Sequence, residues 1–158
     1  MYAIEKILCP TDFEQPSRTA FDVAKSIASK FGAKIIALHV AMTPPEYDEW
    51  APDLPLDDQD LAQRADELSK FQREDGGEIQ RLVLVGNAEA IIVREAEERG
   101  CDLIVMGTAG RGGIGRLLLG SVAEHVSRKA TCPVLLVRDN KASSTEAKTA
   151  PVAAAASH

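Results

Sequence analysis

The sequence predicts an α/β fold with a doubly wound, five-stranded parallel sheet and helices on both of its faces. Two observations support this prediction. First, short apolar runs without strict alternation recur along the chain, which is typical of strands buried on both sides. Second, the segments between these runs carry apolar residues at helical spacing. Strands and helices therefore alternate, and right-handed crossover connections place such strands parallel in one sheet.

The expected strands cover residues 4–9, 34–40, 79–85, 102–106 and 134–137. The expected helices carry apolar stripes within residues 20–31, 61–71, 88–96 and 121–129. Gly32 and Gly100 suit the ends of the first and third helices, and Asn87 is expected to cap the start of the third. Gly76 and Gly77 are expected to end the second helix.

Residues 1–138 are expected to form a single domain, because a chain of 158 residues suffices for one core. Residues 139–158 are rich in Ala, Ser, Thr and Lys, a composition that cannot bury a core and predicts a disordered tail. Residues 42–58 are acidic and rich in proline, so we expect a long surface loop. We interpret its Trp50 as an aromatic side chain packed on the body of the protein, with a lid or partner contact as the alternative.

The charge balance limits the partners of this chain. With 18 basic and 24 acidic side chains the net charge is -6, which argues against nucleic acid as a partner, because its binding sites are usually basic. No apolar stretch is long enough to cross a membrane and the first residues lack the pattern of a signal peptide, so we expect a cytoplasmic protein with no membrane contact. Cys9, Cys101 and Cys132 form no CxxC pair and are interpreted as reduced, structural thiols.

Residues 107–121, GTAGRGGIGRLLLGS, directly follow the apolar run LIVM. Ordering six glycines is costly, so this segment is either a slack connection or one whose backbone closely approaches a ligand. A dinucleotide-binding pattern, GxGxxG, is present at Gly110, Gly112 and Gly115, with Asp139 as a candidate ribose-binding acid. That pattern would lie in the last strand–helix unit, which leaves too few strands after it.

The glycines of this segment also match the spacings of two further phosphate-binding patterns. A P-loop is excluded, because Arg116 and Leu117 stand where its Lys and its Ser or Thr are required. The other pattern has the form G-x2-G-x9-G-S and consists of Gly107, Gly110, Gly120 and Ser121. Ser121 and Glu124 are expected to form a capping box that starts the last helix. The free amides of such a helix N-terminus, together with a hydroxyl, suit a phosphate group.

Over residues 1–138 the chain resembles the universal stress protein family. The resemblance rests on KILCPTDF at residues 6–13, ALHV at 37–40, DLIVMGTAGRGG at 102–113, LLLGSVAEHV at 117–126 and CPVLLVR at 132–138. The nucleotide-binding branch of this family is marked by G-x2-G-x9-G-S/T, which this chain matches without gaps. The resemblance therefore implies an ATP-binding universal stress protein with a Rossmann-like sheet in the strand order 3-2-1-4-5.

The resemblance also implies the binding site, with ATP as ligand, with or without Mg²⁺. The implied binding residues are Pro10, Thr11, Asp12, Val40, Met106, Gly107, Gly110, Arg111, Gly120, Ser121 and Val122. Asp12 is expected to face the nucleoside, where its carboxylate can accept hydrogen bonds from ribose hydroxyls or the adenine amino group. In this strand order the switch point lies between the first and fourth strands, which end at Asp12 and Gly107, and ligands bind there. Family members usually have a serine soon after this aspartate; here the next serine is Ser17.

The last strand is expected to lie at one edge of the sheet and to pair with a second copy of the chain. It consists of Val134, Leu135, Leu136 and Val137. It contains no internal Lys or Pro that would protect an edge, so two copies can join antiparallel across a two-fold axis. Many members of the family dimerise in this way. The sequence identifies neither a downstream protein partner nor a stress signal.

The sequence predicts no catalytic residue and no metal ligand. His39 and His125 are interpreted as packed or capping residues, because no Ser-His-Asp set or metal-ligand spacing accompanies them. We therefore expect a nucleotide-dependent regulatory protein rather than an enzyme, with slow ATP hydrolysis left open. The alternatives are an enzyme that transfers adenylyl groups or hydrolyses ATP, and a scaffold that never binds ATP. AMP and cyclic nucleotides remain open as competing ligands.

Overall fold

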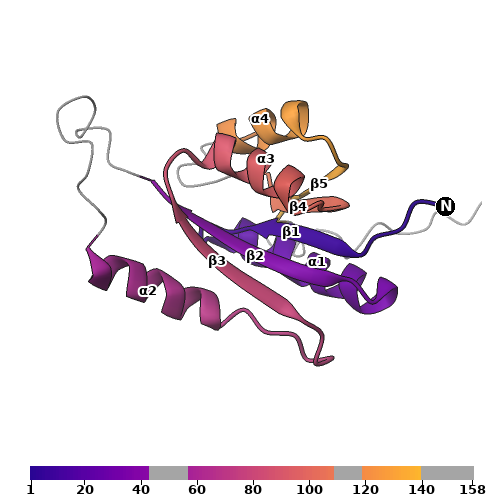
Figure 1. Cartoon of the computed structure of the whole chain (residues 1–158), viewed down its shortest axis with the longest axis horizontal. Coiled ribbons are helices and arrows are strands. Elements are labelled where there is room, and N and C mark those ends of the chain that lie inside the picture. The colour runs from indigo at the N-terminus through magenta and orange to yellow at the C-terminus, as the bar shows by residue number, and fades with distance from the viewer. Residues whose placement is uncertain (43–56, 109–118, 140–158) are drawn as a thin grey trace, which may run out of the picture.

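The computed structural model describes residues 1–42, 57–108 and 119–139. Strands and helices alternate in this part of the chain, as the sequence predicts (Figure 1). The elements are β1 (Lys6–Pro10), α1 (Gln15–Phe31), β2 (Lys34–Ala41), α2 (Asp58–Ser69), β3 (Ile79–Val85), α3 (Ala88–Glu98), β4 (Leu103–Gly107), α4 (Ser121–Lys129) and β5 (Val134–Val137).

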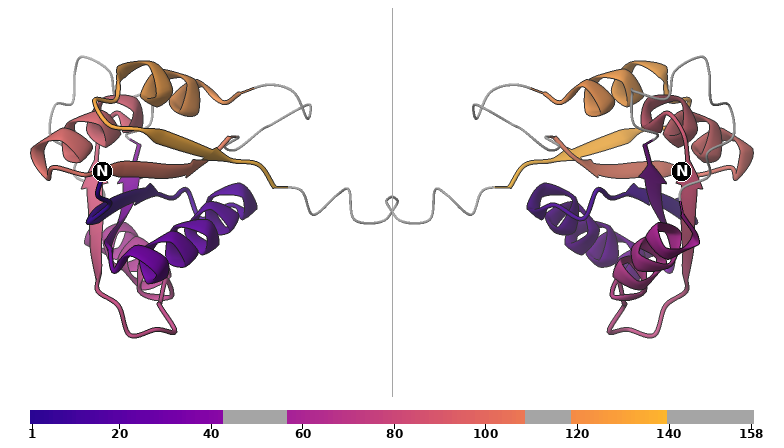
Figure 2. Two further views of the ribbon diagram at one scale, coloured as in Figure 1. Left: turned by 90° about the vertical axis from the view of Figure 1, so that its right-hand side faces the viewer. Right: turned by 90° about the vertical axis from the view of Figure 1, so that its left-hand side faces the viewer.

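The five strands form one parallel sheet in the order β3-β2-β1-β4-β5, so the predicted fold class and strand order are confirmed. Helices α1 and α2 cover one face of the sheet, and α3 and α4 cover the other (Figures 1 and 2). Because α1 follows β1 and α4 follows β4, neighbouring strands lead to opposite faces of the sheet. The switch point between β1 and β4 is thus present as predicted.

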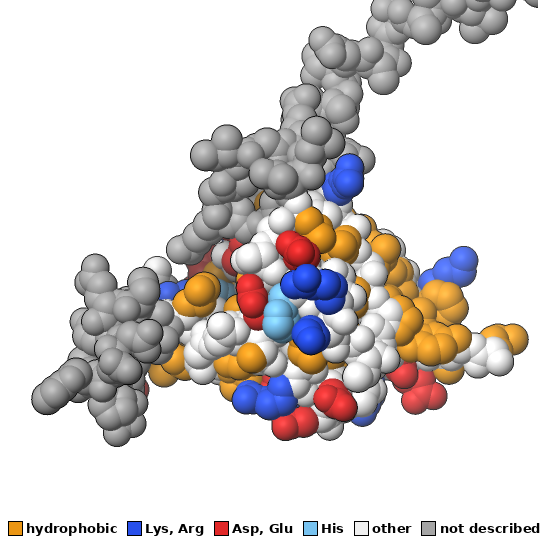
Figure 3. Space-filling view, turned by 90° about the horizontal axis from the view of Figure 1, so that it is seen from above, with side chains coloured by type: hydrophobic (Ala, Val, Ile, Leu, Met, Phe, Trp, Pro, Cys, Tyr) orange, Lys and Arg blue, Asp and Glu red, His pale blue; other side chains and the backbone are white. Residues whose placement is uncertain are grey.

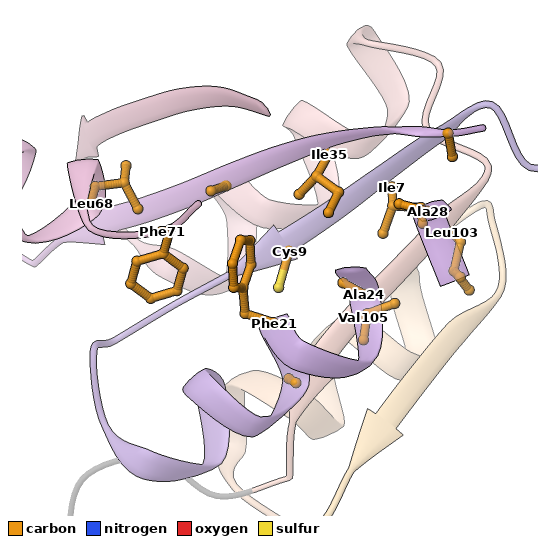
Figure 4. Packing of buried hydrophobic residues seen from close by; sticks show 13 residues of the cluster. Ile7, Cys9, Phe21, Ala24, Ala28, Ile35, Leu68, Phe71, Leu103 and Val105 are labelled. Atoms are coloured by element: carbon orange, nitrogen blue, oxygen red, sulfur yellow. The ribbon is translucent and has the colours of Figure 1, made fainter. Parts of the chain in front are cut away.

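Each central strand is buried on both sides, which explains the missing alternation in its sequence. On the α1 face, Ile7 and Cys9 of β1 and Val105 of β4 pack against Phe21 and other residues of α1 (Figure 4). On the other face a second cluster joins strands to α3 and α4 through Leu8, Ile36, Leu38, Ile104, Ile91, Ile92, Ala123 and Val126. The core therefore fixes β1 and β4 from both sides, directly beneath their carboxyl ends.

Three of the expected helix signals are confirmed. Gly32 ends α1 in the left-handed conformation, with φ of 70°, and Gly100, just past α3, has φ of 61°. The Asn87 side chain accepts a hydrogen bond of 2.9 Å from the Ala90 N–H and caps α3. These positions have the conformations for which glycine and asparagine are preferred.

The predicted end of α2 is wrong, since the helix ends at Ser69 rather than near Gly76. The guanidinium group of Arg81 on β3 donates to the backbone carbonyls of Leu68 and Phe71. It thereby binds one carbonyl of the last helical turn and one just past the helix, and holds the chain after Ser69 in a non-helical path. This contact between distant positions has no local sequence signal.

Asp57 and Asp58 are wrongly included in the expected surface loop of residues 42–58, because Asp58 begins α2 and Asp57 caps it by accepting from the Gln59 N–H. Residues 43–56 of that expected loop lie outside the described residues. Trp50 and residues 140–158 of the expected tail lie outside the described residues. Among the described residues, no helix is both long and apolar enough to cross a membrane.

Candidate nucleotide site

The candidate site lies where β1 and β4 end side by side. The residue pairs between these two strands are only Ile7 with Leu103 and Leu8 with Ile104. The Thr11 N–H donates to the Leu38 carbonyl of β2 at 2.8 Å, so the preceding nitrogen, that of Pro10, faces β4. Proline has no N–H to donate, and the ladder between β1 and β4 therefore stops before the strands end. This leaves the ends of both strands available to a ligand at the switch point.

The N-terminus of α4 is held beside the end of β4. The Thr108 N–H donates to the Val137 carbonyl at 3.1 Å, and the Gly120 N–H donates to the Thr108 carbonyl at 2.8 Å. The first helical bond of α4 runs from the Glu124 N–H to the Gly120 carbonyl. The N–H groups of the first turn, Ser121 and Val122 among them, therefore have no acceptor within the helix, which is the usual arrangement for binding an anion.

The predicted capping box at this helix is wrong. Gly120, with φ of -62° and ψ of 152°, is the N-cap residue, and no side chain of the described residues caps the helix. Ser121 is instead the first helical residue, and its side chain is exposed. The Gly120 N–H is already bonded to Thr108, so Gly120 can serve a ligand only by allowing the backbone to come close.

Gly107 is glycine for a reason that the sequence did not indicate. A Cβ atom at this position would lie 2.9 Å from the carbonyl carbon of Pro16 and 3.0 Å from its Cβ. Pro16 belongs to the first turn of α1, so the end of β4 is packed directly against the start of that helix. Close packing of helix on strand therefore accounts for this glycine, and its implied role in nucleotide binding remains a prediction.

Asp12 holds the start of α1 through one of its two carboxylate oxygens. Oδ1 accepts hydrogen bonds from the Glu14 N–H at 3.0 Å and from the Ser17 hydroxyl at 2.8 Å. Asp12 is half-buried, and Thr11 beside it is buried. Among the described residues, no donor to Oδ2 is present. The carboxylate is therefore fixed on one side and can accept from a ligand on the other.

His39 on β2 anchors the end of β1, which the sequence did not indicate beyond a packed histidine. Its Nδ1 lies 2.8 Å from the Thr11 carbonyl, which can only accept, so Nδ1 carries the proton. Its Nε2 lies 2.9 Å from Nη1 of Arg64 on α2, which can only donate, so Nε2 is unprotonated. The ring also stacks on Phe13 at 4.4 Å between centroids. The neutral imidazole therefore connects β1, β2 and α2 immediately below the candidate site.

The remaining predicted site residues are distributed as follows. Val40 lies near the end of β2 and Met106 near the end of β4, and both pack into the cluster on the α3–α4 face. Gly110 and Arg111 lie outside the described residues. The structure thus brings Pro10, Thr11, Asp12, Met106, Gly107, Gly120, Ser121 and Val122 to the ends of β1 and β4, with Val40 one strand away.

The cysteine thiols and His125 do not belong to the predicted site residues. Burial raises the pKa of the Cys9 thiol to about 12 and that of Cys101 to about 11. Such thiols are poor nucleophiles at neutral pH. Acidic and basic side chains are mixed on the face formed by α3 and α4 (Figure 3). On α4, the His125 Nδ1 lies 3.4 Å from a carboxylate oxygen of Glu89 on α3. Within the described ranges, no group of three His, Cys, Asp or Glu residues could hold a metal ion.

The chain is similar in sequence and in fold to several known proteins. The chain is 37% identical over 142 residues to universal stress protein MJ0531 of Methanocaldococcus jannaschii, covering 87% of this chain and 84% of the relative. The solved structure of MJ0577 from the same organism has a TM-score of 0.73 at 31% identity, covering 89% of this chain and 99% of that one. A universal stress protein solved in complex with cAMP has a TM-score of 0.59 at 29% identity, covering 85% and 97% of the two chains.

The sequence model of the Universal stress protein family matches residues 3–138. This span includes all five strands, all four helices and both sides of the switch point in the described structure. Together with the relatives above, the match shows that the chain belongs to the universal stress protein family.

Proposed function

We propose that this chain is an ATP-binding universal stress protein that acts as a nucleotide-dependent regulatory protein in the stress response. One observation carries the proposal. At the switch point, a carboxylate fixed at the end of β1, that of Asp12, and a helix N-terminus at Ser121 lie at the ends of two neighbouring strands. A carboxylate suits the hydroxyls of a nucleoside, and a helix N-terminus suits phosphate.

In this proposal the adenosine end of ATP, with or without Mg²⁺, binds at Asp12, and the phosphates bind at the N–H groups of Ser121 and Val122. The intact pattern G-x2-G-x9-G-S supports a nucleotide with several phosphates. The relative solved with cAMP supports adenine as the base. The resemblance to the family also assigns Gly110 and Arg111, which lie outside the described residues, to nucleotide binding.

The proposed assembly is a homodimer joined through β5. This strand lies at one end of the sheet and pairs only with β4 among the described strands, so its other edge can pair with a second copy. Leu135 is 38% exposed, whereas Leu136 packs into the core cluster on the α3–α4 face. Leu135 is therefore the apolar side chain of β5 that a partner would cover. We also propose that the protein acts in the cytoplasm.

The proposal is tested by the nucleotide content of the purified full chain. The protein is denatured, released nucleotides are separated by chromatography, and fresh protein is then incubated with ATP for several hours. ATP that is retained unchanged supports a regulatory binding protein. Steady formation of ADP or AMP supports the enzyme alternative. A protein that neither carries nor takes up adenine nucleotide supports the scaffold alternative and contradicts the proposal.

A further inference from the structure

The hydroxyl of Ser17 lies at the centre of a compact hydrogen-bond network at the start of α1. Ser17 is only 5% exposed. Its Oγ lies 2.8 Å from Oδ1 of Asp12, 3.0 Å from Oγ1 of Thr11 and 2.9 Å from the Glu14 carbonyl. A single side chain thus links the two residues that directly follow β1, Thr11 and Asp12.

The direction of these hydrogen bonds follows from the donors available. The Phe13 N–H donates to the Thr11 hydroxyl oxygen at 3.0 Å, so the hydroxyl proton of Thr11 is free to point at Ser17. The Ser17 proton then goes to the Asp12 carboxylate, because an ionised acceptor gives the stronger bond. The reverse direction would bring Ser17 and Asp12 together as two acceptors. The chain of donors therefore runs from Phe13 through Thr11 and Ser17 to Asp12.

This chain of hydrogen bonds depends on a strained backbone conformation at Phe13. Phe13 has φ of 67°, a conformation that non-glycine residues rarely adopt. Its ring is held by stacking on His39 and by an edge contact with Phe71 at 6.1 Å. Strain of this kind is typically retained where a precise arrangement of groups is needed. Here it directs the Phe13 N–H at Thr11.

Helix capping alone does not account for Ser17. The N-cap residue of α1 is Glu14, and Ser17 is the third helical residue, where its hydroxyl donates instead of accepting a helix N–H. The two bonds to Oδ1 of Asp12 come from the N-cap residue and from the first turn of α1, and they fix the carboxylate plane. The other oxygen, Oδ2, has no donor among the described residues and is left for a ligand.

We infer that Ser17 is a positioning residue, which orients the Asp12 carboxylate so that Oδ2 accepts hydrogen bonds from the ribose hydroxyls of the bound nucleotide. The inference rests on the proposed function. Pro16, the neighbour of Ser17, packs on Gly107, so the same helical turn contacts the ends of both β1 and β4. The first turn of α1 therefore sets the position of both strand ends at the site.

The test compares ATP with 2′,3′-dideoxy-ATP, which lacks both ribose hydroxyls, by isothermal titration of the full chain. Ser17→Ala is expected to weaken ATP binding about tenfold, the scale of one hydrogen bond to a charged group, and to leave dideoxy-ATP binding unchanged. Ser17→Cys keeps a weaker donor and is expected to give an intermediate ratio of the two affinities. Ser26→Ala is the matched control, because Ser26 lies on the same helix and its hydroxyl donates to the Asp22 carbonyl, one turn earlier in that helix.

A second comparison tests whether Ser17 affects ATP affinity through Asp12. In an Asp12→Ala background, adding Ser17→Ala is expected to cause no further loss of ATP affinity, because the carboxylate that it orients is gone. If Ser17→Ala does not fold, the affinity ratio in Ser17→Cys decides, and an unchanged ratio overturns the inference. The inference is also overturned if Ser17→Ala weakens the binding of ATP and of dideoxy-ATP equally, or if it lowers ATP affinity further in the Asp12→Ala background. In either case the proposed nucleotide binding itself is not refuted. A wild-type protein that binds neither nucleotide would instead refute the proposed function.

Discussion

Gly107 at the end of β4 lies so close to Pro16 in α1 that a Cβ atom on the glycine would stand 2.9 Å from the proline carbonyl carbon. The backbone of Gly107 is not in the left-handed conformation, so lack of space rather than dihedral strain excludes a side chain. The end of one central strand and the start of the helix after the other are thus in direct contact. Stability and ligand binding are therefore expected to depend on the same contact.

Gly107→Ala is expected to lower the free energy of unfolding by about 1–3 kcal/mol, the usual cost of overpacking, and to weaken ATP binding. The free energy is measured by urea unfolding and the affinity by isothermal titration. Gly32→Ala at the other end of α1 is the control. This variant is expected to lose about 1 kcal/mol through left-handed strain alone, because no described residue other than its chain neighbours lies within 4 Å of the added Cβ, and to keep its ATP affinity. Equal ATP affinities in all three proteins would refute this coupling.

Gly120→Val is expected to abolish ATP binding while the fold remains intact. With φ of -62° and ψ of 152°, Gly120 has a backbone conformation that valine also adopts. The circular dichroism spectrum of the variant should therefore match that of the wild type. The added side chain blocks close approach of phosphate to the start of α4. Adenosine, which has no phosphate, serves as the control ligand and should bind with unchanged affinity. Wild-type ATP affinity in this variant would exclude α4 as the phosphate site.

Leu135→Lys is expected to convert the homodimer into a monomer, because two-fold pairing of β5 would bring the two added charges close together. Sedimentation velocity at micromolar protein concentration measures the change. Gln80→Lys on β3, the strand at the opposite end of the sheet, provides the matched control and should stay dimeric. A monomeric wild type, or a dimer that Gln80→Lys dissociates, would rule out pairing through β5.

The buried thiol of Cys9 predicts a loss of stability at alkaline pH. Its ordinary pKa is 9.0, and burial raises the pKa in the folded protein to about 12. Between these values the unfolded chain releases the proton and the folded chain keeps it, so the free energy of unfolding falls by about 1.4 kcal/mol per pH unit. Urea unfolding from pH 8 to pH 10 should therefore show a steeper decline for the wild type than for Cys9→Ala. Parallel declines would show that this thiol does not contribute.

The sheet could be predicted from the sequence because its strands are short apolar runs bounded by turn residues. β3 and β5 have the predicted bounds, Ile79–Val85 and Val134–Val137. β1 begins at Lys6 rather than at residue 4, because the Asp102 side chain accepts the N–H groups of Glu5 and Lys6. A side chain distant in sequence thus replaces a neighbouring strand as the acceptor, and no local pattern indicates this.

The candidate site was only partly predictable. The resemblance to a family located Asp12 and Ser121, whereas the roles of Ser17, Pro16 and His39 depend on contacts between elements that the sequence does not specify. The prediction of a capping box at Ser121 and Glu124 is wrong for a related reason. The pattern at Ser121 fits a cap, but the bond from the Gly120 N–H to Thr108 fixes Gly120 in extended conformation and makes it the cap instead.

The central claim is that an adenine nucleotide binds at the switch point with its nucleoside at Asp12. The most direct measurement is isothermal titration of ATP and of adenosine into the wild type and Asp12→Ala, with Asp12→Asn as a variant that keeps an oxygen acceptor for the start of α1. We expect the wild type to bind both ligands and Asp12→Ala to weaken both by about 1–3 kcal/mol, the scale of a lost charge-assisted hydrogen bond. A wild type that binds neither ligand, or an Asp12→Ala variant that binds both as tightly as the wild type, would contradict the claim.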